Sequence, residues 1–311
     1  MSPLLSTINL PSSTPLIICG PTGVGKTSFA VELASRFGGE ILGADAFQVY
    51  SGLEILAAQP DAELRARVPH HLIGFLPPSE SFDAARFANL AREKIAEVSA
   101  RGHRPIISGG SGLYLKALTH GLADLPPADP ALRAELGALP LEELQRRLDQ
   151  ADPGAREHLD FQNPRRVLRA LEICLLTGRS SLALREEWKS KSTPGFHGLL
   201  LTRDRAELDA RIGENVKAMF RDGVVGEVRD LTKVGPTAAR AIGLREIQAL
   251  LRGELTEPQC IDAITLATRR YAKRQLTWFR NQFHFQVIDL TGLQNTSEFV
   301  FEPALSGPGP A

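Results

Sequence analysis

The sequence predicts an α/β fold with a parallel sheet at its core and a helical insertion, and three observations support this. A glycine-rich loop at residues 20–27 lies between an apolar run and a segment with helical spacing. Apolar runs then alternate with amphipathic segments, as in parallel sheets whose strands are joined by helices. The stretch from 122 to 195 shows only helical patterns. A chain of 311 residues can form one main domain with such an insertion.

The predicted core begins with a buried strand at residues 16–19, which leads into the glycine loop and a helix. We expect the first fourteen residues to be irregular, because they are rich in Ser, Thr and Pro and show no period. A second strand is predicted at 40–44, beside the first. A helix follows at 84–100, and a third strand at 105–108 ends in another glycine turn, GGSGLYLKAL.

After the insertion, HGLLLTRD at residues 197–204 predicts a strand that returns the chain to the core. Helical spacing continues to about residue 283, and FQVIDL at 285–290 is the last predicted strand. The predicted organisation is a core of 1–121 and 196–290, an insertion of 122–195, and an irregular C-terminal tail of 291–311.

Charge and cysteine content limit the class of protein. Lys+Arg and Asp+Glu balance at 36 each, so a nucleic-acid site has to be found locally. The three scattered cysteines favour neither a disulfide framework nor a zinc cluster, which suggests a reducing compartment. The N-terminus has no basic n-region and no apolar stretch of spanning length. We therefore expect a cytoplasmic protein without a membrane segment, and a monomer, because no dimer surface is evident.

The loop GPTGVGKT fits G-x-x-x-x-G-K-[ST] with the required strand before it and helix after it, which makes the core P-loop NTPase-like. Its backbone N–H groups would cradle a diphosphate or triphosphate, Lys26 would neutralise oxygens, and the Thr27 hydroxyl would bind Mg²⁺. The third strand ends in Gly109-Gly110-Ser111 instead of the acid that a P-loop hydrolase needs, which favours a transferase. The predicted phosphate-binding residues are Gly20, Pro21, Thr22, Gly23, Val24, Gly25, Lys26 and Thr27.

Asp45, in GADAFQVY, follows the second predicted strand. Its carboxylate could accept a proton from a nucleophile, bind a ligand hydroxyl or support Mg²⁺, whereas the alternative is a turn or N-cap aspartate. Gln48 could read a base edge or face solvent. His70 and His71 are adjacent on an extended chain and point to opposite sides, so we favour a packed, hydrogen-bonded histidine over a metal site.

Basic side chains concentrate in three segments. RRYAKRQLTWFR, residues 269–280, contains five cations and no acid, interleaved with aromatic residues. This pattern suits contacts with a phosphate backbone and stacked bases, and the alternative is a solvated face over an aromatic core. The other segments are NPRRVLRALE in the insertion and ARAIGLRE near residue 240. Three such clusters in a neutral protein suggest a long polyanion as partner.

Together these stretches resemble the bacterial tRNA dimethylallyltransferases, also called tRNA isopentenyltransferases, from about residue 16 to 285. The resemblance rests on GPTGVGKT, ADxxQVY at 44–50, PHHLI at 69–73, PIISGGSGLYLKAL at 105–118, NPRRVLRALE at 163–172, RAELDARI at 205–212, AIGLREI at 241–247 and TRRYAKRQLTWFR at 268–280. It implies magnesium-dependent transfer of a dimethylallyl group from dimethylallyl diphosphate to N6 of the adenosine on the 3′ side of the tRNA anticodon, with release of diphosphate.

The resemblance also implies residue roles. Asp45 would be the general base, Ser111, at a position that is usually threonine, would lie beside the reaction centre, and Arg205 would grip the diphosphate with the P-loop and Thr27. Basic clusters would hold the anticodon stem-loop around a flipped base. The implied tRNA contacts are Asp45, Ala46, Phe47, Gln48, Ser111, Arg133, Arg165, Arg166, Val167, Leu168, Arg169, Arg240, Gly243, Arg245, Lys273, Arg274, Gln275, Thr277, Trp278 and Arg280.

The chain departs from the family pattern at several positions. The replaced residues include two serines, a threonine and four charged groups, and they now read Gly43, Ala46, Ser51, Leu56, Ala57, Gln59, Gly74 and Asn215. Because hydroxyls and cations are lost, we expect a change in affinity, rate or loop-sequence preference. Lys26, Thr27, Asp45 and Gln48 are kept, so we expect activity.

Three other functions remain as alternatives. In a small-molecule P-loop kinase, Asp45 would orient a substrate hydroxyl and the nucleotide would be ATP. A prenyltransferase acting on free adenine nucleotides is closer, but the arginine-rich insertion argues against it. An RNA-binding protein without catalytic activity would leave the P-loop unused.

Overall fold

The computed structural model describes residues 8–10, 14–122, 125–126, 129–184, 195–293 and 301–303. It divides into two compact units, one formed by Met1–Leu118 and Gly195–Ala311, the other by Thr119–Pro194. No helix among the described residues is both long and apolar enough to cross a membrane.

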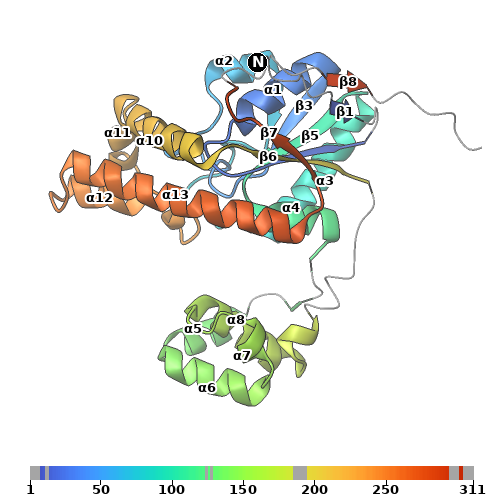
Figure 1. Cartoon of the computed structure of the whole chain (residues 1–311). Coiled ribbons are helices and arrows are strands. Elements are labelled where there is room, and N and C mark those ends of the chain that lie inside the picture. The colour runs from blue at the N-terminus through green and yellow to red at the C-terminus, as the bar shows by residue number, and fades with distance from the viewer. Residues whose placement is uncertain are drawn as a thin grey trace, which may run out of the picture. The chain divides into compact units, whose positions relative to one another are not determined.

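The larger unit is built on a six-stranded parallel sheet with the order β4-β3-β5-β2-β6-β7 (Figure 1). The strands are β2 (Leu16–Cys19), β3 (Gly39–Gly43), β4 (His70–His71), β5 (Arg104–Gly109), β6 (His197–Thr202) and β7 (Gln286–Asp289). Each of the five predicted core strands is present within two residues of its expected bounds. The predicted α/β class with a parallel sheet is therefore confirmed.

The predicted position of β3 beside β2 is wrong, because β5 lies between them and pairs with both. Ile106 and Ile107 of β5 are wholly buried, as expected for a strand that is paired on both sides in a sheet with both faces covered. A Cβ on Gly109, the last residue of β5, would lie 2.1 Å from the Ala44 carbonyl oxygen. The small end of β5 therefore lets the chain after β3 approach the P-loop.

Helices cover both faces of the sheet (Figure 1). Successive strand residues alternate between the two faces, so Ile17 and Ile107 belong to one hydrophobic core and Ile18 and Ile106 to the other. The helices of this part of the chain are α1 (Lys26–Phe37), α2 (Ala62–Arg67), α3 (Ala84–Ala100), α4 (Gly112–His120), α10 (Arg205–Arg221), α11 (Val224–Arg229), the 3₁₀ helix η1 (Ala238–Arg240), α12 (Leu244–Leu251) and α13 (Glu257–Gln282).

The smaller unit is helical and contains no strand among its described residues. Its helices are α5 (Pro130–Gly137), α6 (Leu141–Ala151), α7 (Ala155–His158) and α8 (Pro164–Thr177). Leu136, Leu148, Val167 and Leu171 form the centre of its own hydrophobic core. This core comes from amphipathic spacing on short helices, which is the pattern that the sequence displays.

The predicted irregular ends each contain a short strand. β1 (Ile8–Leu10) and β8 (Phe301–Pro303) form a separate two-stranded parallel sheet. A pairing between segments so far apart in the chain leaves no local periodicity, which is why the sequence pattern missed it. The rest of the predicted tail, residues 294–300 and 304–311, lies outside the described residues.

Candidate active site

The P-loop connects β2 to α1, and its glycines permit backbone angles that other residues avoid. Gly20, Gly23 and Gly25 have φ of 154°, 79° and 107°. A Cβ on Gly20 would also lie 2.6 Å from the Leu201 carbonyl oxygen. Gly25 is the N-cap of α1 and supplies no capping side chain, so the first N–H groups of this 12-residue helix keep their capacity for an anion.

A cavity of about 320 Å³ opens beside this loop. Its polar side is lined by Lys26, Thr27, Ser28, Asp45, Gln48 and Arg211. Its apolar side is lined by Leu56, Val216, Met219, Ile242 and Ile264. An anion-binding loop therefore faces a hydrophobic wall across a space large enough for a small ligand.

Lys26 provides the cation of the polar side. Its Nζ donates to the Pro21 carbonyl oxygen over 2.8 Å, which holds the ammonium over the loop. Removal from water lowers the pKa of Lys26 to about 8, although Asp45 nearby acts to raise it. Because this pKa lies close to neutrality, the charge of Lys26 depends on pH in that range. A bound anion would stabilise the protonated form.

Asp45 has two differently placed carboxylate oxygens. Oδ1 accepts a hydrogen bond from the Phe47 N–H over 3.0 Å, so the predicted turn-forming role is present. Oδ2 lies 3.6 Å from the position that a Cβ on Gly110 would occupy. One oxygen therefore holds the turn while the other faces the Gly110 side of the cavity.

Ser111 and Gln48 hold the backbone around Asp45. The Ser111 Oγ accepts a hydrogen bond from the Ala46 N–H over 2.8 Å, and the described residues that line the cavity do not include Ser111. Gln48 lines the cavity and donates from Nε2 to the Ala58 carbonyl oxygen over 2.8 Å, where the chain has a φ of 49°. Both side chains stabilise turns that shape the site.

Arg205, the residue implied to grip the diphosphate, does not reach the cavity. Its side chain is 82% exposed, and its Nε lies 4.0 Å from an Asp209 carboxylate oxygen. The cavity follows the later turns of α10, from Arg211 to Met219, and six residues correspond to about 9 Å along a helix. Arg205 is the first residue of α10 and therefore lies too far along the helix axis from the residues that line the cavity.

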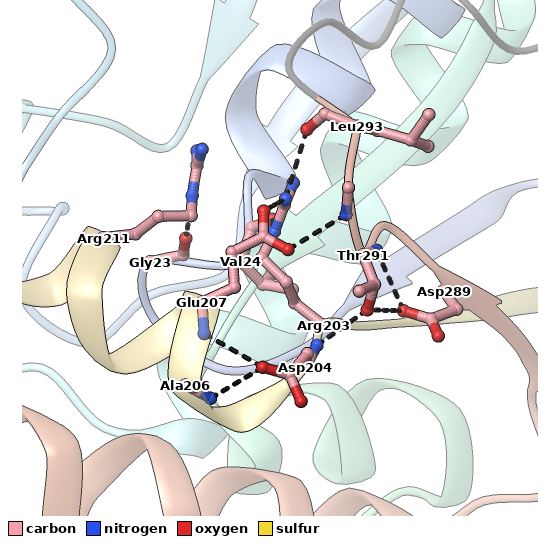
Figure 2. A network of polar contacts seen from close by, with 11 residues as sticks. Gly23, Val24, Arg203, Asp204, Ala206, Glu207, Arg211, Asp289, Thr291 and Leu293 are labelled. Atoms are coloured by element: carbon pink, nitrogen blue, oxygen red, sulfur yellow. Dashed lines mark hydrogen bonds and ion pairs between the residues drawn. The ribbon is translucent and has the colours of Figure 1, made fainter.

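Two other arginines contact the P-loop. Arg211 lines the cavity and donates from Nε to the Gly23 carbonyl oxygen over 3.1 Å (Figure 2). The Arg203 side chain is only 3% exposed, forms an ion pair with Glu207, and donates to the carbonyl oxygens of Val24 and Leu293. Neither Arg203 nor Arg211 is among the site residues predicted from the sequence. The spacing of Arg211 with buried Leu208 and Ile212 on α10 is the signal that would have placed it on the inner face.

A second cavity, of about 180 Å³, is lined by the Gly110 turn and by α13. Its lining is Gly110, Gly112, Leu113, Tyr271, Arg274, Gln275, Trp278 and Phe279. Tyr271 and Gln275 also line the first cavity. A Cβ on Gly112 would lie 2.2 Å from the Trp278 ring, so glycine is required for this aromatic wall to pack against α4.

The basic face predicted on α13 is partly present. Lys273, Arg274, Thr277 and Arg280 are exposed, whereas Gln275 is 6% exposed. Arg269 has an acidic neighbour from outside this segment: its Nη2 donates to the Asp209 carbonyl oxygen over 3.0 Å, and its Nε lies 4.0 Å from the Asp209 carboxylate. The acid comes from α10, which packs along α13.

The predicted basic cluster near residue 240 lies on η1 and α12. Arg240 and Arg245 are exposed there, and Gly243 is the N-cap of α12 with a φ of 97°.

In the smaller unit, Arg133 and Arg169 both contact Glu172. Arg133 donates from Nε over 2.9 Å and Arg169 from Nη1 over 2.6 Å. Burial acts to raise the pKa of Glu172, but the hydrogen bonds from these arginines outweigh it and hold the pKa below its ordinary value. The implied tRNA contact of Val167 is corrected, because Val167 is wholly buried in the helical core. Arg165 and Arg166 are exposed and Leu168 is partly exposed.

We expect Glu172→Gln to destabilise the helical unit by about 2 kcal/mol, because hydrogen bonds to charged groups contribute about 1.5–3 kcal/mol. The neutral amide also leaves two arginines without their counter-ion. Urea unfolding followed by hydrogen exchange on α8 measures the loss. Glu143→Gln on α6, which breaks two arginine contacts at the surface, is the control and is expected to change stability much less, because surface ion pairs are screened by solvent. Equal effects would contradict the structural role.

A family model described as IPP transferase matches residues 48–282. The chain belongs to the IPP transferase family. The tRNA dimethylallyltransferase 1 of Citrifermentans bemidjiense is 45% identical over 270 residues, which cover 85% of this chain and 88% of the relative. The tRNA dimethylallyltransferase of Akkermansia muciniphila is 41% identical over 267 residues, with coverage of 86% and 90%. The resemblance inferred from the motifs is therefore confirmed.

Solved structures agree with this family membership. The full-length tRNA isopentenylpyrophosphate transferase from Bacillus halodurans is 38% identical, with a TM-score of 0.66 and coverage of 91% of both chains. A eukaryotic dimethylallyltransferase acting on tRNA is 26% identical, with a TM-score of 0.78 over 91% of this chain and 76% of the other.

The family departures differ in their distance from the cavity. Leu56, Ala57 and Asn215 line it, so these replacements reshape the site itself. Gly43 is explained by packing, because a Cβ there would lie 2.6 Å from the Ile73 side chain. Gln59 donates to the Tyr50 carbonyl oxygen over 2.7 Å and so belongs to the supporting structure.

Proposed function

We propose that this chain transfers a dimethylallyl group from dimethylallyl diphosphate to N6 of the adenosine that follows the anticodon in tRNA, with release of diphosphate. The observation that carries the proposal is the composition of the first cavity. The P-loop, Lys26 and Arg211 offer positive charge to a diphosphate, and Leu56, Val216 and Met219 offer an apolar wall to a short hydrocarbon. A five-carbon allyl diphosphate has both of these properties in one small molecule.

The residues of the first cavity also fit a divalent cation such as Mg²⁺. The Thr27 hydroxyl lines it and is a hard oxygen ligand, the type that Mg²⁺ takes together with substrate phosphates. When bound, the cation would stabilise negative charge on the departing diphosphate. Lys26 and the open N–H groups of α1 would stabilise the same charge.

The acceptor base would enter by the second cavity. Trp278 and Arg274 offer stacking surfaces there, and Asp45 Oδ2 faces the Gly110 turn, which lines this cavity. As the bond between the allyl carbon and the diphosphate oxygen breaks, the new bond from N6 forms and Asp45 takes the proton that N6 loses. Exposed cations on α13, with Arg240, Arg245, Arg165 and Arg166, would hold the RNA phosphates.

The kinase alternative is disfavoured by the sheet order. In the described sheet the neighbours of β2 are β5 and β6, which end at Gly109 and Thr202 and so carry no acid beside the P-loop. Asp45 follows β3, one strand further away. Cys19, Cys174 and Cys260 are buried and are not joined by disulfides, which supports a reducing compartment such as the cytoplasm.

The test is incubation of the protein with labelled dimethylallyl diphosphate, Mg²⁺ and either tRNA or AMP. We expect label in tRNA. Label in AMP alone, or ATP consumption without prenyl transfer, would contradict the proposed function. A tRNA with guanosine in place of the target adenosine is the matched substrate control.

We expect Arg211→Gln to weaken donor binding by about 10–100-fold, since a charge-assisted hydrogen bond contributes about 1.5–3 kcal/mol. Arg205→Gln, on the same helix but 82% exposed, serves as its matched control and is expected to leave donor affinity unchanged. Calorimetric titration with diphosphate measures both affinities. The reverse order of effects would restore Arg205 as the diphosphate ligand.

A further inference from the structure

Gln275 bridges the two loops that define the proposed reaction centre. Its Oε1 accepts a hydrogen bond from the Thr22 N–H of the P-loop over 2.9 Å. Its Nε2 donates to the Gly110 carbonyl oxygen over 2.9 Å. The side chain is 6% exposed and lines both cavities. Both ends of the amide are therefore used, one on the donor side and one on the acceptor side.

The surrounding backbone is built around this amide. A Cβ on Gly110 would lie 2.3 Å from Gln275 Nε2 and 3.6 Å from Asp45 Oδ2. Gly110 does not have the positive φ that by itself would require glycine. The requirement for glycine at this position comes from the approach of Gln275, which sits beside the carboxylate proposed as the base.

We propose that Gln275 is a positioning residue that sets the distance between the donor diphosphate and Asp45 and couples donor binding to RNA binding on α13. This proposal rests on the function proposed above. The P-loop has other N–H groups and Lys26 for the diphosphate, so Gln275 is not needed for donor affinity. Its role is to hold the P-loop against the Gly110 turn. The distance between these loops matters for the rate, because a misplacement of about 1 Å can lower a rate by about 10²-fold.

Coupling follows from the location of Gln275 on α13. Lys273, Arg274 and Thr277 are exposed on this helix within two residues of Gln275. An RNA that binds these side chains and fixes this part of α13 would also fix the hydrogen bond from the Thr22 N–H to Gln275. Since coupling between two sites is reciprocal, donor diphosphate should then strengthen RNA binding by the same factor.

The direct test compares Gln275→Met, which keeps the side-chain length but loses both hydrogen bonds, with Gln282→Met. Gln282 lies on the same helix and its Oε1 accepts a hydrogen bond from Lys116 of α4, so its variant loses a side-chain amide contact away from the cavities. We expect the Thr22 amide to exchange with solvent deuterium faster in Gln275→Met and at the wild-type rate in Gln282→Met. Unchanged Thr22 protection in Gln275→Met would overturn the bridge, whether or not tRNA is the acceptor.

Kinetics then separate positioning from stability. Gln275→Met is expected to lower kcat about 10–100-fold per folded molecule while the affinity of the RNA-free enzyme for dimethylallyl diphosphate changes little. The gain in anticodon stem-loop affinity caused by added diphosphate should disappear in this variant and persist in Gln282→Met. Wild-type kcat and coupling in a folded Gln275→Met would refute the proposal. A wild-type enzyme that fails to prenylate tRNA would instead refute the proposed function.

Gly110→Ala provides a second approach if Gln275→Met folds poorly. In the single variant Gly110→Ala, the new methyl group displaces the Gln275 amide. In the double variant with Gln275→Ala, the methyl group occupies the space that the amide has left, so we expect a higher thermal stability than in Gly110→Ala. We expect kcat of the double variant to stay at least about tenfold below wild type, because the bridge is still missing. Recovery of kcat together with stability would show that Gln275 only fills space.

Discussion

Asp45→Ala is expected to lower kcat for tRNA prenylation by about 10²–10⁴-fold while tRNA affinity stays close to wild type. The exocyclic amino group of adenine is a poor nucleophile until its proton has an acceptor, and Asp45 Oδ2 is the carboxylate oxygen that faces the acceptor side. Single-turnover transfer of labelled dimethylallyl diphosphate measures the rate, and filter binding measures the affinity.

Asp45→Asn distinguishes a base from a turn residue. The amide oxygen can still accept the hydrogen bond from Phe47 N–H, so the turn is kept while the base is lost. We expect a rate as low as that of the alanine variant. Asp83→Asn, at the N-cap of α3, changes an equivalent turn acceptor elsewhere and should leave the rate unchanged. A near-wild-type rate for Asp45→Asn would remove Asp45 as the general base.

Lys26→Met is expected to reduce kcat/KM for dimethylallyl diphosphate by about 10²–10³-fold, the effect of removing one preorganised group that stabilises developing negative charge. Methionine fills a similar space, so the P-loop backbone should be preserved. Thr27 and the N–H groups of α1 remain, which is why we expect residual activity.

The pH dependence of donor binding tests the same residue. Only protonated Lys26 attracts the diphosphate, and its pKa is about 8 in the free protein. Wild-type affinity for the donor should therefore be full below pH 8 and fall as pH rises through 8, by up to about tenfold per unit. Lys26→Met should lose this fall. Identical profiles for the two proteins would contradict the role of the Lys26 charge.

Local patterns were sufficient for much of the fold. The apolar run at β2, the glycine loop and the start of α1 are adjacent in the chain, so their order alone predicted an anion-binding site at the carboxyl end of the sheet. The helix predicted at 84–100 from its apolar spacing has the bounds of α3, and the structure adds that the Asp83 side chain caps its beginning.

Other features depended on partners distant in the chain. The sequence placed β3 beside β2, whereas the wholly buried residues of β5 take that central position. Arg205 matched the family pattern for a diphosphate ligand, but the cavity follows later turns of α10 and includes Arg211. Arg133 and Arg169 were expected to face RNA, yet both contact buried Glu172.

The sequence by itself determined the chemistry available to this protein: a P-loop with Lys26 and Thr27, a carboxylate at Asp45, and cations on α13. These are properties of residue type and short spacing, which survive in any fold that keeps the local segments. Only the tertiary structure decided which groups meet. It brought Arg211 to Gly23, and it placed Gln275 between Thr22 and Gly110, more than 160 residues away along the chain from either loop. Such contacts are set by how buried apolar faces pack together, and a single sequence carries no local signal of that packing.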